Sequence, residues 1–118
     1  AYAAHMAALL GAHIIKVKPP TDVLEQPEAT KVYEQVNLPR AELAERIRHI
    51  MQASFAGRRI VVFSGGAAKD RSGLLEEIRG LRDGGANGSI IGRNTFQRPR
   101  DEALDLLSEI IGIYKSAS

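Results

Sequence analysis

The sequence has 118 residues, of which 44% are hydrophobic and 25% are charged, and its formal net charge is +2. This composition is ordinary for a globular domain in water. Because the charges are interspersed and form no basic stripe, we expect no nucleic-acid partner, and no apolar run is long enough to cross a membrane. The absence of cysteine excludes disulfides and thiolate metal sites. A cytoplasmic enzyme or binding protein is the default expectation.

The first eleven residues read as the end of a helix that Gly11 terminates, so the chain reads as starting in the middle of a fold. A short strand should follow at residues 14–18. Side chains alternate across a strand, which places Lys16 and Lys18 on one face and Ile15 and Val17 on the other.

The stretch 19–38 is polar and has three prolines before residue 30. We expect a long surface loop with one helical turn near residues 31–35. Loops of this length in compact domains are usually lids, contacts with other subunits or disordered segments.

Three more helices and two more strands follow. Pro39 should open a helix that Gly57 stops, and residues 59–63 form a strand apolar enough to be covered on both faces. Asp70 or Ser72 should cap the next helix, which Gly84 and Gly85 should end. The apolar helix faces expected are Leu43, Ile47, Ile50 and Met51, then Leu74, Leu75, Ile78 and Leu81, and last Leu104, Leu107, Ile111 and Tyr114.

The final strand is expected at residues 89–91, with an extra helical turn at 94–97 and a last helix from Pro99. This alternation predicts an α/β fold with a parallel sheet. It fits a small doubly wound sheet or a piece of a TIM (β/α)8 barrel, which typically needs about 250 residues.

Lys16 is flanked by isoleucines and a valine and should be dehydrated, with its pKa lowered by burial and by the charges of Lys18 and Arg93. Such an amine can form a Schiff base with a carbonyl substrate. The alternative is a strand-end lysine that extends to solvent, and this stretch alone favours that reading.

Two glycine turns follow successive strands, Ser64-Gly65-Gly66 and Gly92-Arg93. In parallel βα arrays the active site lies at the carboxyl ends of the strands, where glycines let backbone N–H groups approach an anion. Arg93 could bind a phosphate through two hydrogen bonds. The three histidines have no metal-ligand spacing, so no metal site is expected.

The motifs Gly-Ala-His-Ile-Ile-Lys at 11–16, Ser-Gly-Gly at 64–66 and Gly-Arg-Asn-Thr-Phe-Gln at 92–97 resemble class I fructose-bisphosphate aldolases of the archaeal and bacterial DhnA type. The resemblance covers essentially the whole chain, residues 1–118. It implies the C-terminal part of a TIM barrel, strands 6 to 8 with their helices.

The resemblance implies a lyase of glycolysis and gluconeogenesis that cleaves fructose 1,6-bisphosphate into dihydroxyacetone phosphate and glyceraldehyde 3-phosphate. Lys16 would form the imine and Lys18 would be a supporting cation. The phosphate ligands would be Ser64, Gly65, Gly66, Gly92 and Arg93. It implies no cofactor and a homo-oligomer, for which the family suggests a decamer.

The family's strand-1 aspartate and strand-5 tyrosine have no counterpart here, so the chain should need the N-terminal part of the barrel and be inactive alone. After strand 6 it reads Lys16-Val17-Lys18-Pro19-Pro20, where many relatives read Lys-Thr-Lys-Tyr-Thr. Relatives also act on other sugar phosphates, among them a dideoxy-heptulosonate synthase and a thiolase. Further alternatives are a half-barrel like the histidine-pathway cyclase and a non-catalytic phosphate-binding scaffold.

Overall fold

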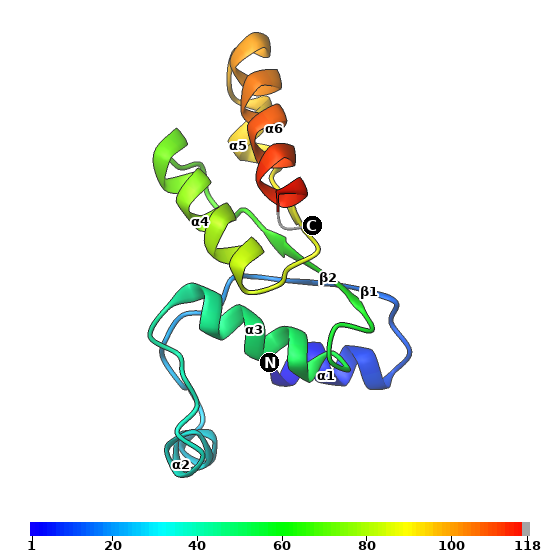
Figure 1. The fold of residues 1–118 in the computed structure, drawn as a ribbon, viewed down its shortest axis with the longest axis vertical. Helices are drawn as coiled ribbons and strands as arrows, with labels where there is room; N and C mark the ends of the chain where they lie inside the picture. Colours follow the sequence, from blue (N-terminus) through cyan, green and yellow to red (C-terminus); the bar gives the residue numbers. More distant parts are fainter. Residues whose placement is uncertain (117–118) are drawn as a thin grey trace.

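The computed structural model describes residues 1–116 as one small parallel sheet with helices packed along it (Figure 1). The strands are β1 (Ile14–Val17), β2 (Ile60–Ser64) and β3 (Gly88–Ile90). The helices are α1 (Tyr2–Leu9), α2 (Pro27–Gln35), α3 (Leu43–Ala53), α4 (Arg71–Asp83), α5 (Gly92–Phe96) and α6 (Arg100–Lys115). The strand order is β1-β2-β3 and both pairings are parallel, so the predicted βα alternation is confirmed.

Within residues 1–116 the sheet is covered on one face only. Ile15, Val61 and Phe63 are buried in a single core with residues of α1, α3, α4 and α6. On the opposite face Ile14 and Ile90 are 64% and 48% exposed. The prediction that the strands are covered on both faces is therefore wrong for residues 1–116, because α1, α3, α4 and α6 all pack on the same side.

The helix ends predicted from glycines and caps are confirmed for α1 and α4. Gly11 follows α1 with a φ of 94°, a left-handed conformation that glycine adopts without steric cost. Asp70 caps α4, and its carboxylate accepts a hydrogen bond from the Gly73 N–H at 3.1 Å. Gly84 ends α4, and a Cβ there would lie 2.4 Å from Ile47 Cβ, so glycine permits the close approach of α4 to α3.

Two predicted boundaries are corrected. Helix α3 starts at Leu43 rather than at Pro39, because Glu42 and Glu45 form a capping box in which the Glu42 N–H donates to the Glu45 carboxylate at 3.1 Å. The stretch 19–38 holds the nine-residue helix α2 where one turn was expected, with Pro27 in its first turn. Figure 1 shows α2 lying apart from the sheet and the other helices.

Helix α6 presents a different face to the core from the one predicted. It buries Leu106, Ile110 and Ile113, while Leu104 and Ile111 are 48% and 53% exposed. Apolar residues cover more of the surface of α6 than its contact with the core uses, so the periodicity alone did not predict which of them are buried. No helix in the described residues has the length and apolar character needed to cross a bilayer.

Candidate functional site

Lys16 lies on the open face of the sheet, because its neighbour Ile15 is buried on the covered face. Lys16 pairs with Val62 across β1 and β2, and Val62 pairs with Gly88 across β2 and β3. Gly88 has no side chain, so in this row of three residues only Lys16 and Val62 place side chains on the open face. The predicted dehydration of Lys16 is wrong for residues 1–116, where its side chain is exposed. The reason is geometric: Ile14 shares the open face and is itself exposed, and Ile15 faces away.

A shallow depression lies at the carboxyl ends of β1 and β2. Its lining residues are Lys18, Pro19, Ser64, Gly65, Gly66, Ala67, Lys69 and Glu77. The Ser64 hydroxyl oxygen is buried and has no hydrogen-bond partner among the described residues. Lys69 is ion-paired with Glu77, whereas Lys18 has no ion pair within residues 1–116. The depression thus combines a lysine without an ion pair and a buried hydroxyl without a hydrogen-bond partner.

The turn after β2 is built around two glycines. The Gly65 N–H donates to the Ile90 carbonyl at 2.9 Å, which carries the pairing of β2 with β3 beyond the strand ends. A Cβ on Gly65 would lie 2.7 Å from Ile91 Cγ2, so a larger residue would push the two turns apart. Gly66 has a φ of 67°, in the left-handed region that favours glycine.

Asn94 joins the two turns, and sequence reasoning assigned it no role beyond the extra helical turn. It is 2% exposed, and its Oδ1 accepts a hydrogen bond from the Lys69 N–H at 2.8 Å. Its Nδ2 donates to the carbonyl oxygens of Ala67 and Gly65 at 3.1 and 3.3 Å. The available signal was an asparagine in a turn after a strand, where side-chain amides often satisfy loop backbone groups.

Arg98 adds a second link between the same segments. Its Nε donates to the Asn94 carbonyl at 2.8 Å, and its guanidinium also donates to the Lys69 carbonyl at 2.9 Å. Both backbone polar groups of Lys69 are therefore held by the segment 94–98. The two turns form one unit rather than two independent loops.

Gly92 and Arg93 lie at the start of α5, the extra helical turn predicted at 94–97, which begins two residues earlier than expected. Arg93 is exposed and has no hydrogen bond or ion pair from its side chain within the described chain. Neither residue lines the depression at Lys18. The structure therefore brings Lys18, Ser64, Gly65 and Gly66 together and connects Arg93 to them through its neighbour Asn94.

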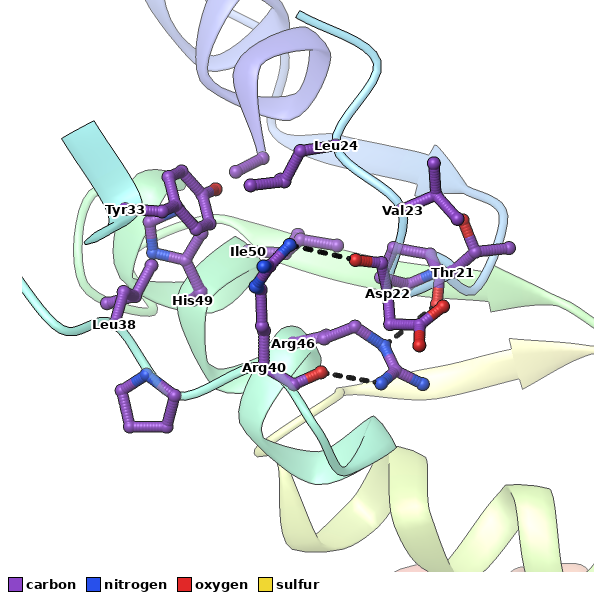
Figure 2. Close-up of a pocket in the computed structure, with 13 residues that line it drawn as sticks. Thr21, Asp22, Val23, Leu24, Tyr33, Leu38, Arg40, Arg46, His49 and Ile50 are labelled. Atoms are coloured by element: carbon purple, nitrogen blue, oxygen red, sulfur yellow. Dashed lines mark hydrogen bonds between the residues drawn. The ribbon is translucent and has the colours of Figure 1, made fainter. Parts of the chain in front are cut away.

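A separate pocket lies between the segment 20–24, α2 and α3 (Figure 2). Arg40 donates to the Asp22 carbonyl at 3.1 Å, and Arg46 donates to the Pro20 carbonyl at 3.1 Å and to the Arg40 carbonyl at 2.7 Å. None of the predicted site residues lines this pocket. Its arginines hold loop carbonyls, so we interpret it as the packing of the 19–42 segment onto α3.

The histidines contact other parts of the structure and do not converge. The Nδ1 of His5 lies 2.7 Å from the Ala53 carbonyl oxygen. His49 packs edge-on against Tyr33, with ring centroids 5.1 Å apart. Burial lowers the pKa of His49 below its ordinary value. Within residues 1–116 no three histidine, aspartate or glutamate side chains cluster as a metal ion would need.

Three parallel strands with helices on one face, and glycine turns at the carboxyl ends of β2 and β3, define part of a (β/α)8 barrel. Two solved structures share this fold: an archaeal fructose 1,6-bisphosphate aldolase and a Schiff-base-forming fructose-1,6-bisphosphate aldolase. Each has a TM-score of 0.68 and 23% identity over 96% of this chain, and the match covers 35% and 36% of those proteins. The predicted fold class is confirmed.

Residues 1–98 match the model of the DeoC/LacD family of aldolases, and the chain belongs to this family. The class 1 fructose-bisphosphate aldolase of Halobacterium salinarum is 34% identical over 121 residues, which cover 100% of this chain and 36% of that protein. A probable class 1 fructose-bisphosphate aldolase of Chlamydia muridarum is 31% identical over 119 residues, covering 93% of this chain and 34% of the relative. The chain thus spans about a third of the length of these relatives. The predicted resemblance to class I fructose-bisphosphate aldolases is confirmed.

Proposed function

We propose that the chain is the C-terminal part of a class I fructose-bisphosphate aldolase, in which Lys16 forms a Schiff base with the substrate. The observation that carries the proposal is the placement of two lysines at the same end of the sheet as the glycine turn after β2: Lys16 on the open face of β1, and Lys18 just past its end, in the depression beside that turn. The family match and the names of the relatives support the same reaction class.

The proposed chemistry starts with attack of the neutral Lys16 amine on the substrate ketone. Uptake of a proton and loss of water give a protonated imine, and the bond between C3 and C4 then breaks with its electron pair moving into the imine to form an enamine. The C4 hydroxyl gives its proton to a base in the N-terminal part of the barrel, and the C4–C6 fragment leaves as glyceraldehyde 3-phosphate. Protonation of the enamine at C3 and hydrolysis of the imine release dihydroxyacetone phosphate and restore the Lys16 amine.

The phosphate ligands proposed are Ser64, Gly65 and Gly66 from the first turn and Gly92 and Arg93 from the second. The Ser64 hydroxyl has no hydrogen-bond partner, which supports the proposal that the first turn binds phosphate. The guanidinium of Arg93 is unpaired in the described chain, which supports the same role for the second turn. Lys18 lines the same depression as Ser64, which supports a role as a cation beside the substrate.

The open face of the sheet supports the proposal that the N-terminal part of the barrel, in the same or another chain, completes the site. Its strands would cover the exposed side chains of Ile14, Ile60 and Ile90 and exclude water from Lys16, which favours the neutral amine. We further propose a homo-oligomeric enzyme of the cytoplasm that acts in glycolysis and gluconeogenesis.

The test is a cleavage assay on the completed barrel. Purified enzyme should release glyceraldehyde 3-phosphate from fructose 1,6-bisphosphate, and Lys16→Met should abolish the release while Lys18→Met retains part of it. The same assay with other phosphorylated aldol substrates tests the choice of sugar. Cleavage of another sugar phosphate in place of fructose 1,6-bisphosphate, or turnover by Lys16→Met, would contradict the proposal.

A further inference from the structure

We propose that Asn94 is a positioning residue that aims two backbone N–H groups, those of Gly66 and Ala68, at a phosphate group of the substrate. This inference rests on the phosphate site of the proposed function and assigns the part of the structure that shapes it. Asn94 itself would not touch the phosphate.

The argument follows from peptide geometry. In a planar trans peptide the carbonyl of one residue and the N–H of the next point in opposite directions, and residues 1–116 contain no cis peptide bond. Asn94 Nδ2 holds the carbonyl oxygens of Gly65 and Ala67. The N–H groups of Gly66 and Ala68 must therefore point away from Asn94.

These N–H groups are available to a ligand. Neither Gly66 nor Ala68 donates a backbone hydrogen bond within the described residues. Gly66 lines the depression, as does Ala67, which adjoins Ala68, and Ser64 with its buried, unpartnered hydroxyl lines it too. N–H groups that a turn presents on the same side can form a concave binding site for an anion. The peptide between Ala68 and Lys69 has the reverse orientation, because the Lys69 N–H donates to Asn94 Oδ1, so the Lys69 N–H is not one of these donors.

Asn94 has enough hydrogen-bonding groups to hold two peptide planes at once, the one between Gly65 and Gly66 and the one between Ala67 and Ala68. One side chain supplies two donors and one acceptor to three peptide groups, and its burial excludes water that would compete for them. Arg98 fixes the Asn94 backbone from the other side. An aspartate of the same shape would place an acceptor against the two carbonyls and should release both planes.

The experiment uses the completed barrel and inorganic phosphate as the probe. Titration calorimetry should show that Asn94→Ala and Asn94→Asp raise the phosphate Kd about 10- to 100-fold, since hydrogen bonds to charged groups are lost or misaligned. The matched control is Asn87→Ala, because the Asn87 side chain also binds backbone, accepting from the Val61 N–H at 2.8 Å, but lies at the amino end of β3. This control should lose stability and keep the wild-type Kd.

A second measurement needs no variant. Addition of phosphate to wild-type protein should shift the amide NMR signals of Gly66 and Ala68 more than that of Lys69, whose N–H is already bonded to Asn94. Unshifted amides at both positions, no phosphate binding by the wild type, or a wild-type Kd in folded Asn94→Ala would each overturn the inference. If phosphate binding depends on Asn94 but no aldol cleavage occurs, the proposed reaction fails and this inference stands.

Discussion

Gly65→Ala should damage the phosphate turn through a single steric contact. A Cβ at Gly65 would lie 2.7 Å from Ile91 Cγ2 and 3.4 Å from Asn94 Nδ2. Carbon atoms pack at about 3.5–4.0 Å, so the first distance is about 1 Å too short. Ile91 Cγ2 is attached directly to a branch point near the backbone and cannot swing aside freely. Overpacking of this kind costs about 1–3 kcal/mol, and the relief available is a separation of the two turns.

Urea unfolding and phosphate titration of the completed barrel measure both consequences. Gly65→Ala should lower the free energy of unfolding by about 1–3 kcal/mol and weaken phosphate binding. In the double variant with Ile91→Ala the clash disappears, so the two substitutions should show a favourable coupling of about 0.5–3 kcal/mol. Gly66→Ala meets no atom within 4 Å and should be strained by its φ alone, so Ile91→Ala should not rescue it. Equal effects of Ile91→Ala in both backgrounds would refute the reasoning.

Four further outcomes are expected. Arg93→Ala should raise the substrate KM about 10-fold or more with little change in kcat, and unchanged steady-state kinetics would place the phosphate elsewhere. Gly84→Ala should destabilise the protein more than Gly65→Ala in urea unfolding, because its Cβ would lie 2.4 Å from Ile47 Cβ and 2.8 Å from the Ala44 carbonyl oxygen. Burial lowers the pKa of His49 from 6.5, so its contribution to stability is full above about pH 6.5 and is lost as the pH falls; His49→Gln should flatten that part of a urea-midpoint profile. The 118-residue chain alone should be inactive and should self-associate through its open strand edges, and a monomeric, cooperatively folding chain in ultracentrifugation and urea unfolding would contradict this.

The parts of the fold that local chemistry determines were predictable. The order of strands and helices followed from hydrophobic periodicity, and the ends of α1 and α4 followed from Gly11, Asp70 and Gly84. These signals act within a few residues of the chain and need no knowledge of tertiary packing.

Features that depend on what covers a surface were not predictable in the same way. A strand such as Ile60–Ser64 has the same apolar sequence whether or not its second face is covered in the described chain. The same holds for the exposed Leu104 and Ile111 of α6, whose apolar stripe is wide enough for two partners. The dehydration expected for Lys16 failed for this reason, because flanking isoleucines shield a lysine only when their shared face is covered.

The candidate site was predictable as a set of motifs but not as a connected structure. Glycines at strand ends located the turns at Gly65 and Gly92. The hydrogen bonds of Asn94 reach Gly65, Ala67 and Lys69, which lie 29, 27 and 25 positions earlier in the chain. No local pattern specifies such a contact, because it exists only once β2 and β3 are paired.

Borohydride trapping followed by peptide mapping tests most directly whether Lys16 is the Schiff-base nucleophile. The completed barrel is incubated with dihydroxyacetone phosphate, reduced and digested, and the modified lysine is identified by mass spectrometry. The adduct should lie on Lys16, should be absent from Lys16→Met, and should persist in Lys18→Met. An adduct on Lys18, or undiminished trapping in Lys16→Met, would contradict the assignment.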